Sequence, residues 1–79
     1  MPLTILHDHF ATEIGTPDEP ASKRAVALHL GEHRNYYSRA ILRDQATVRT
    51  LRRWCRAWVA AGHDPVPVAV LGAALRPPT

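Results

Sequence analysis

The sequence predicts an all-α protein, a compact bundle of four to five helices that contains a helix-turn-helix unit. Apolar residues recur at spacings of three and four over residues 3–14 and 48–61, which is the period of a helix with one buried face. A glycine, Gly31, divides residues 22–41 into two short segments that read as helix, turn and helix. The one run rich in β-branched residues, 65–70, has no second strand to pair with, so we expect no sheet.

The first expected helix covers residues 3–14. Its apolar residues lie at spacings of three, four and four and are Leu3, Leu6, Phe10 and Ile14. Gly15, followed by Thr16 and Pro17, is a typical helix stop. Residues 15–21 are therefore expected to form a linker.

The second expected helix covers residues 23–30 and begins after Ser22, a good N-cap. Thr16 with Glu19 also matches a capping box, so an earlier start is an alternative. A helix that started there would carry Pro20 where the first intrahelical amide bond should form, which favours Ser22. Gly31 ends the helix, because only glycine takes a left-handed conformation there without strain.

The third expected helix covers residues 33–41 and crosses the second one close to a small residue, Ala27. On a helical wheel, Tyr37 lies on the inner side with Ala40 and Ile41. The opposite side is polar and consists of Asn35, Ser38 and Arg39.

The fourth expected helix covers residues 48–61 and starts at the N-cap Thr47. Its apolar face consists of Val48, Leu51, Cys55 and Trp58, flanked by Trp54 and Val59. Its other face is basic and consists of Arg49, Arg52, Arg53 and Arg56. We expect both tryptophans and the cysteine to be core residues, because they share the apolar face with leucine.

Residues 62–75 are expected to form a C-terminal dimerisation helix, and residues 76–79 a tail, of a single domain with its core in residues 3–61. Asp64 offers an N-cap and Pro65 a first-turn proline, although the β-branched run leaves a strand open as an alternative. The segment has more apolar surface than a small bundle readily covers, which indicates a two-fold dimer. The candidate dimer contacts are Val66, Val70, Leu71 and Leu75.

The charged residues are unevenly distributed along the chain. Residues 1–20 carry four acidic residues and no lysine or arginine, whereas residues 21–58 carry nine basic residues against two acidic ones. The basic charge therefore lies over the helix-turn-helix unit and the helix after it. Such a concentration is typical of proteins that bind the phosphates of nucleic acid.

Composition and spacing exclude several other classes of function. A single cysteine, Cys55, allows neither an internal disulfide nor a cysteine-based zinc site. His7 and His9 point to different helix faces, and a turn separates His29 from His33, so we expect no metal site. No stretch reaches the roughly 18–20 apolar residues of a membrane span, and no secretory signal is visible, which favours a cytoplasmic protein. A chain this short offers little concave volume, so we expect no enzyme activity, cofactor or small-molecule ligand.

Residues 22–41, with Ala27 four residues before Gly31, resemble the helix-turn-helix of the phage lambda repressor and Cro-like (XRE) class. Residues 47–58 resemble the fourth helix of that class, so the resemblance covers about residues 3–61. It implies that the third helix enters the major groove of double-stranded DNA, with base edges read by His33, Arg34, Asn35, Ser38 and Arg39. It also implies, with the charge distribution, that phosphates are bound by Lys23, Arg24, Arg43, Arg49 and Arg52. The sequence departs from the class at Glu32, where an apolar residue is usual, and at Tyr37, where valine or isoleucine is usual.

The function expected from these observations is a small transcriptional repressor that binds an inverted-repeat operator as a homodimer, of the kind that phages, prophages and plasmids encode. Two alternatives remain open. One is an interaction or inhibitor protein that binds an acidic protein through the basic fourth helix or the apolar C-terminal helix. The other is an architectural or recombination accessory factor with the same fold.

Overall fold

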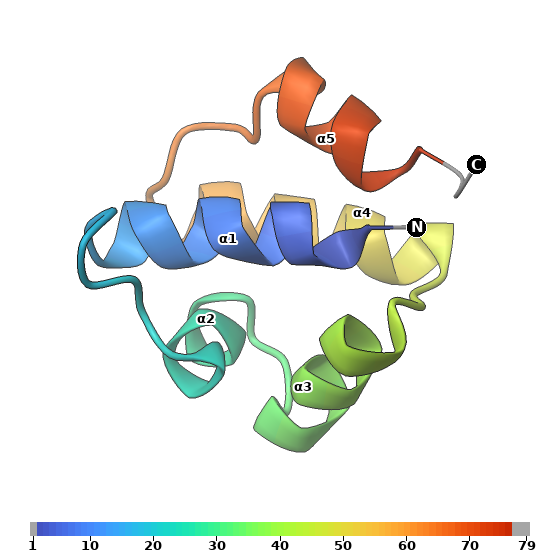
Figure 1. Ribbon diagram of the computed structural model, residues 1–79, viewed down its shortest axis with the longest axis horizontal. Coiled ribbons are helices and arrows are strands. Elements are labelled where there is room, and N and C mark those ends of the chain that lie inside the picture. The colour runs from blue at the N-terminus through green and yellow to red at the C-terminus, as the bar shows by residue number, and fades with distance from the viewer. Residues whose placement is uncertain (1, 77–79) are drawn as a thin grey trace.

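The computed structural model describes residues 2–76, and this part of the chain is all-helical, with no strand (Figure 1). The five helices are α1 (Leu3–Ile14), α2 (Lys23–His29), α3 (Arg34–Arg43), α4 (Val48–Ala60) and α5 (Val68–Ala74). The radius of gyration is 11.5 Å. Since a single folded domain of this length has a radius of about 12 Å, the described residues form one compact body. The predicted all-α class is confirmed.

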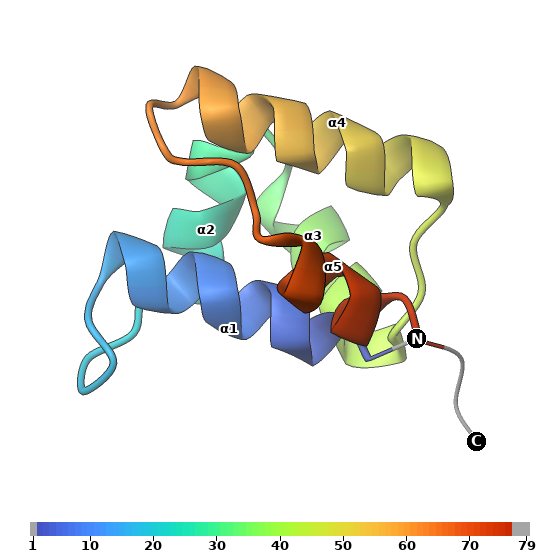
Figure 2. The same cartoon turned by 90° about the horizontal axis from the view of Figure 1, so that it is seen from above.

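The helices form three layers. α1 and α4 run side by side in the middle layer, α2 and α3 lie on one side of it, and α5 lies on the other (Figures 1 and 2). The interior between the layers is filled by large side chains, of which Phe10, Tyr37, Trp54 and Trp58 are all buried. The rings of Phe10 and Trp58 lie 4.6 Å apart, and those of Tyr37 and Trp54 lie 5.1 Å apart. The four aromatic residues thus join α1, α3 and α4, and the prediction that both tryptophans are core residues is confirmed.

The prediction that Val48 and Val59 belong to the buried face of α4 is wrong. Val48 is 61% exposed and Val59 is also exposed, whereas Thr50 is buried. The inner face of α4 is centred on Trp54 and Trp58, the largest side chains of the helix, and this rotates Val48 and Val59 toward solvent. Cys55 is half-buried, and burial raises the pKa of its thiol.

The predicted helix starts at Ser22 and Thr47 are confirmed. The Ser22 hydroxyl accepts a hydrogen bond from the Ala25 amide at 3.2 Å, and the Thr47 hydroxyl accepts one from the Thr50 amide at 3.1 Å. Thr16 accepts a hydrogen bond from the Glu19 amide at 2.9 Å, but residues 15–22 are not helical. That pair closes a turn of the linker, so the alternative helix start is wrong.

The C-terminal helix is shorter than predicted, and the strand alternative is wrong. α5 begins after Pro67, so the predicted start at Asp64 and Pro65 is not used. A proline restricts the preceding residue to extended conformations, and Pro67 therefore keeps Val66 out of a helix. The extended segment places the Val66 side chain in the core, where it is 8% exposed. Of the predicted tail, Arg76 follows α5, and residues 77–79 lie outside the described residues.

Candidate nucleic-acid interface

The turn between α2 and α3 is closed by hydrogen bonds of the Schellman type. Gly31 has a φ of +63°, its amide donates to the Leu28 carbonyl at 3.2 Å, and the Glu32 amide donates to the Ala27 carbonyl at 2.9 Å. Ala27 is buried, as its predicted place under the crossing helix requires. Because the carbonyl groups at the end of α2 are used in this way, the turn holds α3 at a fixed angle to α2.

α3 presents a polar outer face to solvent. His33, Arg34, Asn35 and Arg39 are exposed and Ser38 is half-exposed, whereas Tyr37, Ala40 and Ile41 face the core. Three of the predicted base-reading residues come together in one surface hollow, which is lined by His33, Asn35, Tyr36, Arg39, Ala40, Arg43 and Gln45. No acidic residue lines this hollow.

His33 lies at the tip of this face and caps α3. Its Nδ1 accepts a hydrogen bond from the Asn35 backbone amide at 3.2 Å. A neutral imidazole that accepts at Nδ1 carries its proton on Nε2, so the ring can still offer a hydrogen-bond donor. The helix begins one residue later than predicted, because His33 is the cap and not the first helical residue.

Three residues of the α3 surface were missed by the sequence analysis. Tyr36 and Gln45 line the hollow, and Leu42 is 80% exposed on the outer side of the helix. A helical wheel places Tyr36 beside Arg39 and Arg43, so its position could have been read from the spacing. Gln45 lies beyond the end of α3 and had no such signal.

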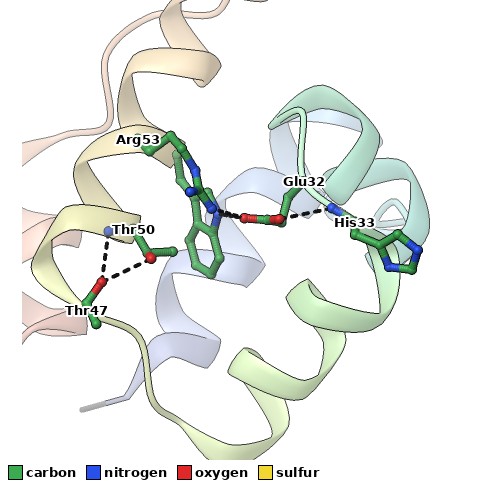
Figure 3. A network of polar contacts seen from close by, with 6 residues as sticks. Glu32, His33, Thr47, Thr50 and Arg53 are labelled. Carbon is green, nitrogen blue, oxygen red and sulfur yellow. Dashed lines mark hydrogen bonds and ion pairs between the residues drawn. The ribbon is translucent and has the colours of Figure 1, made fainter.

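Glu32 is turned away from the outer face of α3 and toward α4 (Figure 3). Its Oε2 accepts a hydrogen bond from Trp54 Nε1 at 3.1 Å and pairs with the guanidinium of Arg53, and its Oε1 accepts from the His33 backbone amide at 3.1 Å. Burial would raise the pKa of this carboxyl, but the three hydrogen bonds and the charge of Arg53 outweigh it and lower the pKa below the usual 4.5. The Glu32 carboxyl therefore stays ionised, and the guanidinium of Arg53 balances its charge.

Tyr37, the other departure from the class pattern, has both the room and the partner that its size requires. Its side chain is fully buried, and its hydroxyl lies 2.7 Å from Nδ1 of His7 on α1. Burial raises the pKa of the Tyr37 phenol, with a smaller contribution from Asp8. The phenol therefore keeps its proton, and its hydrogen bond with the imidazole ties α3 to α1.

The predicted phosphate-binding residues are divided between two sides of the molecule. Lys23, Arg24, Arg43 and Arg49 are exposed, and Arg24 lines a second hollow with Ala27, Leu28, Glu32, His33 and Arg34. This hollow joins the outer side of α2 to the start of α3. Arg52 instead lines a groove between α4 and α5, so the structure does not bring it to the surface around α3.

The predicted dimer contacts are only partly available at the surface. Val66 belongs to the core of its own chain, and including it in a dimer surface is wrong in this structure. Val70 and Leu71 are partly buried against the core, and Leu75 is 45% exposed. α5 also lies on the opposite side of the middle layer from α3 (Figure 1).

The histidines meet in a pair that the sequence analysis did not anticipate. Nδ1 of His29, at the end of α2, lies 3.1 Å from Nε2 of His63, which follows α4. The His63 ring also stacks on Trp58, with 3.7 Å between ring centroids. Within residues 2–76, histidine, cysteine and acidic side chains form no group of three or more that could hold a metal ion.

Comparisons of the chain with protein-family models, with curated proteins and with solved structures give no match. Within residues 2–76, none of the helices has the length and apolar character needed to cross a membrane.

Proposed function

We propose that this chain is a small sequence-specific DNA-binding protein that regulates transcription by inserting α3 into the major groove. The observation that carries the proposal is the outer face of α3, on which Asn35, Arg39 and Arg43 line one hollow that has no acidic residue. The major groove is wide enough to admit an α-helix, and the edges of its base pairs present donors and acceptors. Arginine matches guanine and asparagine matches adenine through paired hydrogen bonds, so Arg39 and Asn35 offer the two commonest reading groups.

The other residues around α3 have distinct roles in the proposal. His33 and Arg34 reach base edges or phosphate from the tip of the helix, and Ser38 lies beside Arg39. Lys23, Arg24, Arg43 and Arg49 bind the phosphate backbone, which fixes the position of α3 without reading sequence. Glu32 does not repel the DNA, because Trp54 and Arg53 hold its carboxylate.

In this proposal the protein acts in the cytoplasm as a repressor, without catalytic activity, and two copies occupy the half-sites of an inverted repeat about 34 Å apart. α3 and α5 lie on opposite sides of the middle layer, so the proposed DNA surface does not include the predicted dimer contacts on α5.

An electrophoretic mobility-shift titration tests the proposal. The labelled probe is the DNA upstream of the protein's own coding sequence, and the competitor is the same DNA with its sequence scrambled, at physiological salt. We expect a specific shift that resists the scrambled competitor. We also expect the logarithm of the association constant to fall linearly with the logarithm of the salt concentration, with a slope of about −0.9 for each phosphate that the protein neutralises. Equal competition by the scrambled DNA would contradict sequence-specific binding, and a salt-independent affinity would contradict phosphate contact.

A further inference from the structure

α4 and α5 enclose an apolar groove with a volume of 540 Å³, which the proposed DNA surface does not use. It is lined by Val48, Leu51, Arg52, Cys55 and Arg56 of α4 and by Leu71 and Leu75 of α5. Val48 and Leu75 are 61% and 45% exposed, so part of the apolar lining is in contact with water. Removing such apolar surface from water favours a complex.

Two arginines give this groove a positive rim. Arg52 and Arg56 are four residues apart, so they lie one above the other on α4, about 6 Å apart along its axis. Within the part of the chain that the structure describes, neither forms an ion pair, whereas their neighbour Arg53 is paired with Glu32. α4 carries four arginines and no acidic residue of its own. The groove therefore lacks both an apolar cover and the negative charge that would match its rim.

A second copy of this chain does not supply that negative charge. In a two-fold interface both copies present the same surface patch. None of the residues that line the groove is acidic, so a symmetric dimer would place two copies of Arg52 and Arg56 in one interface without a counter-charge. Burying charges without partners is costly.

We propose that the groove between α4 and α5 binds an amphipathic helix of a partner protein, with acidic residues flanking its apolar face. Apolar side chains at helical spacing cover Val48, Leu51, Leu71 and Leu75, as in other helix-in-groove complexes. Carboxylates one turn apart on the partner helix pair with Arg52 and Arg56. α5 lies on the far side of the middle layer from α2 and α3, so the α5 side of the groove faces away from the proposed DNA surface (Figure 1).

Fluorescence anisotropy with two labelled peptides tests the proposal. Both are alanine-based helices of about 18 residues, long enough to be partly helical alone, with leucines at helical spacing. One carries glutamates beside the leucines, and its twin carries lysines at the same places. We expect the acidic peptide to bind with a Kd of ~10–100 μM and the basic peptide to bind at least about tenfold more weakly. The double variant Arg52→Glu with Arg56→Glu should reverse this preference.

A matched control makes the same change of net charge on the other side of the molecule. Arg24→Glu with Arg34→Glu should leave peptide binding unchanged and abolish DNA binding. The two readouts are separate, so loss of DNA binding alone bears on the proposed function and loss of peptide binding alone bears on this inference.

Three results would overturn the inference. They are equal binding of both peptides, no binding of either at about 1 mM, and a preference that the double variant does not reverse. Sedimentation equilibrium of the chain alone tests whether a second copy of the chain covers the groove instead. If the chain is a dimer at about 100 μM and Leu75→Glu makes it a monomer, a second copy covers the groove and the inference is wrong.

Discussion

Glu32 and Trp54 are joined by a hydrogen bond of 3.1 Å between a carboxylate oxygen and the indole N–H. The two residues belong to the turn before α3 and to the middle of α4, so this bond fixes the turn to the central layer. Trp54 is fully buried, and the indole N–H is a donor that has to be satisfied. An acidic residue at the turn therefore serves the core of this protein, although an apolar residue is usual there in the class that the chain resembles.

Replacing Glu32 with alanine should destabilise the fold by about 1–3 kcal/mol, because the buried Trp54 donor loses its acceptor. Glu32→Gln keeps an acceptor oxygen and should cost less. Unfolding in urea, followed by tryptophan fluorescence, measures both free energies of unfolding. Glu13→Ala, at an exposed position of α1, is the matched control. An alanine effect at Glu32 no larger than that at Glu13 would show that the hydrogen bond does not contribute.

The bounds of the helices could be predicted largely from the sequence because the signals are local. The stripe of residues 3–14, the caps Ser22 and Thr47, and the turn at Gly31 all act within a few residues, and the structure has each of them. The prediction failed at two places. Pro67 keeps Val66 extended, which is a local signal that was overlooked, whereas packing against distant residues decides how α4 is rotated about its axis.

The candidate site shows the same difference between local patterns, which the sequence reveals, and contacts between distant residues, which it does not. The helical wheel placed Asn35 and Arg39 on the outer face of α3, because periodicity alone fixes which residues share a face. The partners of Glu32 and Tyr37 could not be predicted, since Trp54 and His7 are 22 and 30 residues away in the sequence. Likewise, nothing local indicates that Arg52 faces α5 while Arg53 faces the turn before α3.

The stability of the fold should fall as the pH drops below about 6.5, and His7 should be one cause. Burial lowers the pKa of the His7 imidazole; Asp8 opposes this shift and Lys23 adds to it. A lowered pKa in the folded state means that the unfolded chain takes up a proton first, so acid favours unfolding. The stability that neutral His7 contributes is fully present above about pH 6.5 and is lost as the pH falls through the lowered pKa of His7 in the folded state.

Urea midpoints at pH 7, 6 and 5 measure this dependence in the wild type and in His7→Gln. We expect the urea midpoint to change less with pH in the variant than in the wild type, because glutamine does not titrate. Tyr37→Phe removes the hydroxyl that bonds His7 and should lower stability by about 1 kcal/mol at pH 7. If the urea midpoint depends on pH equally in His7→Gln and in the wild type, groups other than His7 cause the acid sensitivity.

Two glycines should respond in opposite directions to replacement by alanine. A Cβ at Gly15 would lie 2.3 Å from the Glu19 carbonyl oxygen and 2.9 Å from the Ala21 amide nitrogen, and both are backbone atoms. The linker folds back here, because the amides of Gly15 and Ala21 both donate to the Ala11 carbonyl at 2.9 Å. Gly15→Ala should therefore cost about 2 kcal/mol or more.

Gly72 is the matched control for this experiment. It lies within α5, and a Cβ there meets no atom within 4 Å. Alanine is a better helix former by about 1 kcal/mol, so Gly72→Ala should raise the melting temperature by several degrees. Thermal unfolding followed by circular dichroism measures both variants. A Gly15→Ala variant as stable as the wild type would mean that the linker does not fold back against the end of α1.

Substitutions on α2 and α3 should separate reading of bases from binding of phosphates. Arg39→Ala or Asn35→Ala should reduce discrimination at one base position by ~1–3 kcal/mol, because each removes a paired contact with a base edge. Lys23→Ala or Arg43→Ala should weaken binding to every sequence alike and reduce the salt slope by about one. Competition titrations with single-base variants of the operator, repeated at two salt concentrations, measure both effects. If the two pairs of variants change affinity and discrimination in the same way, α3 binds only the backbone. If neither pair changes the affinity, α3 does not lie against DNA.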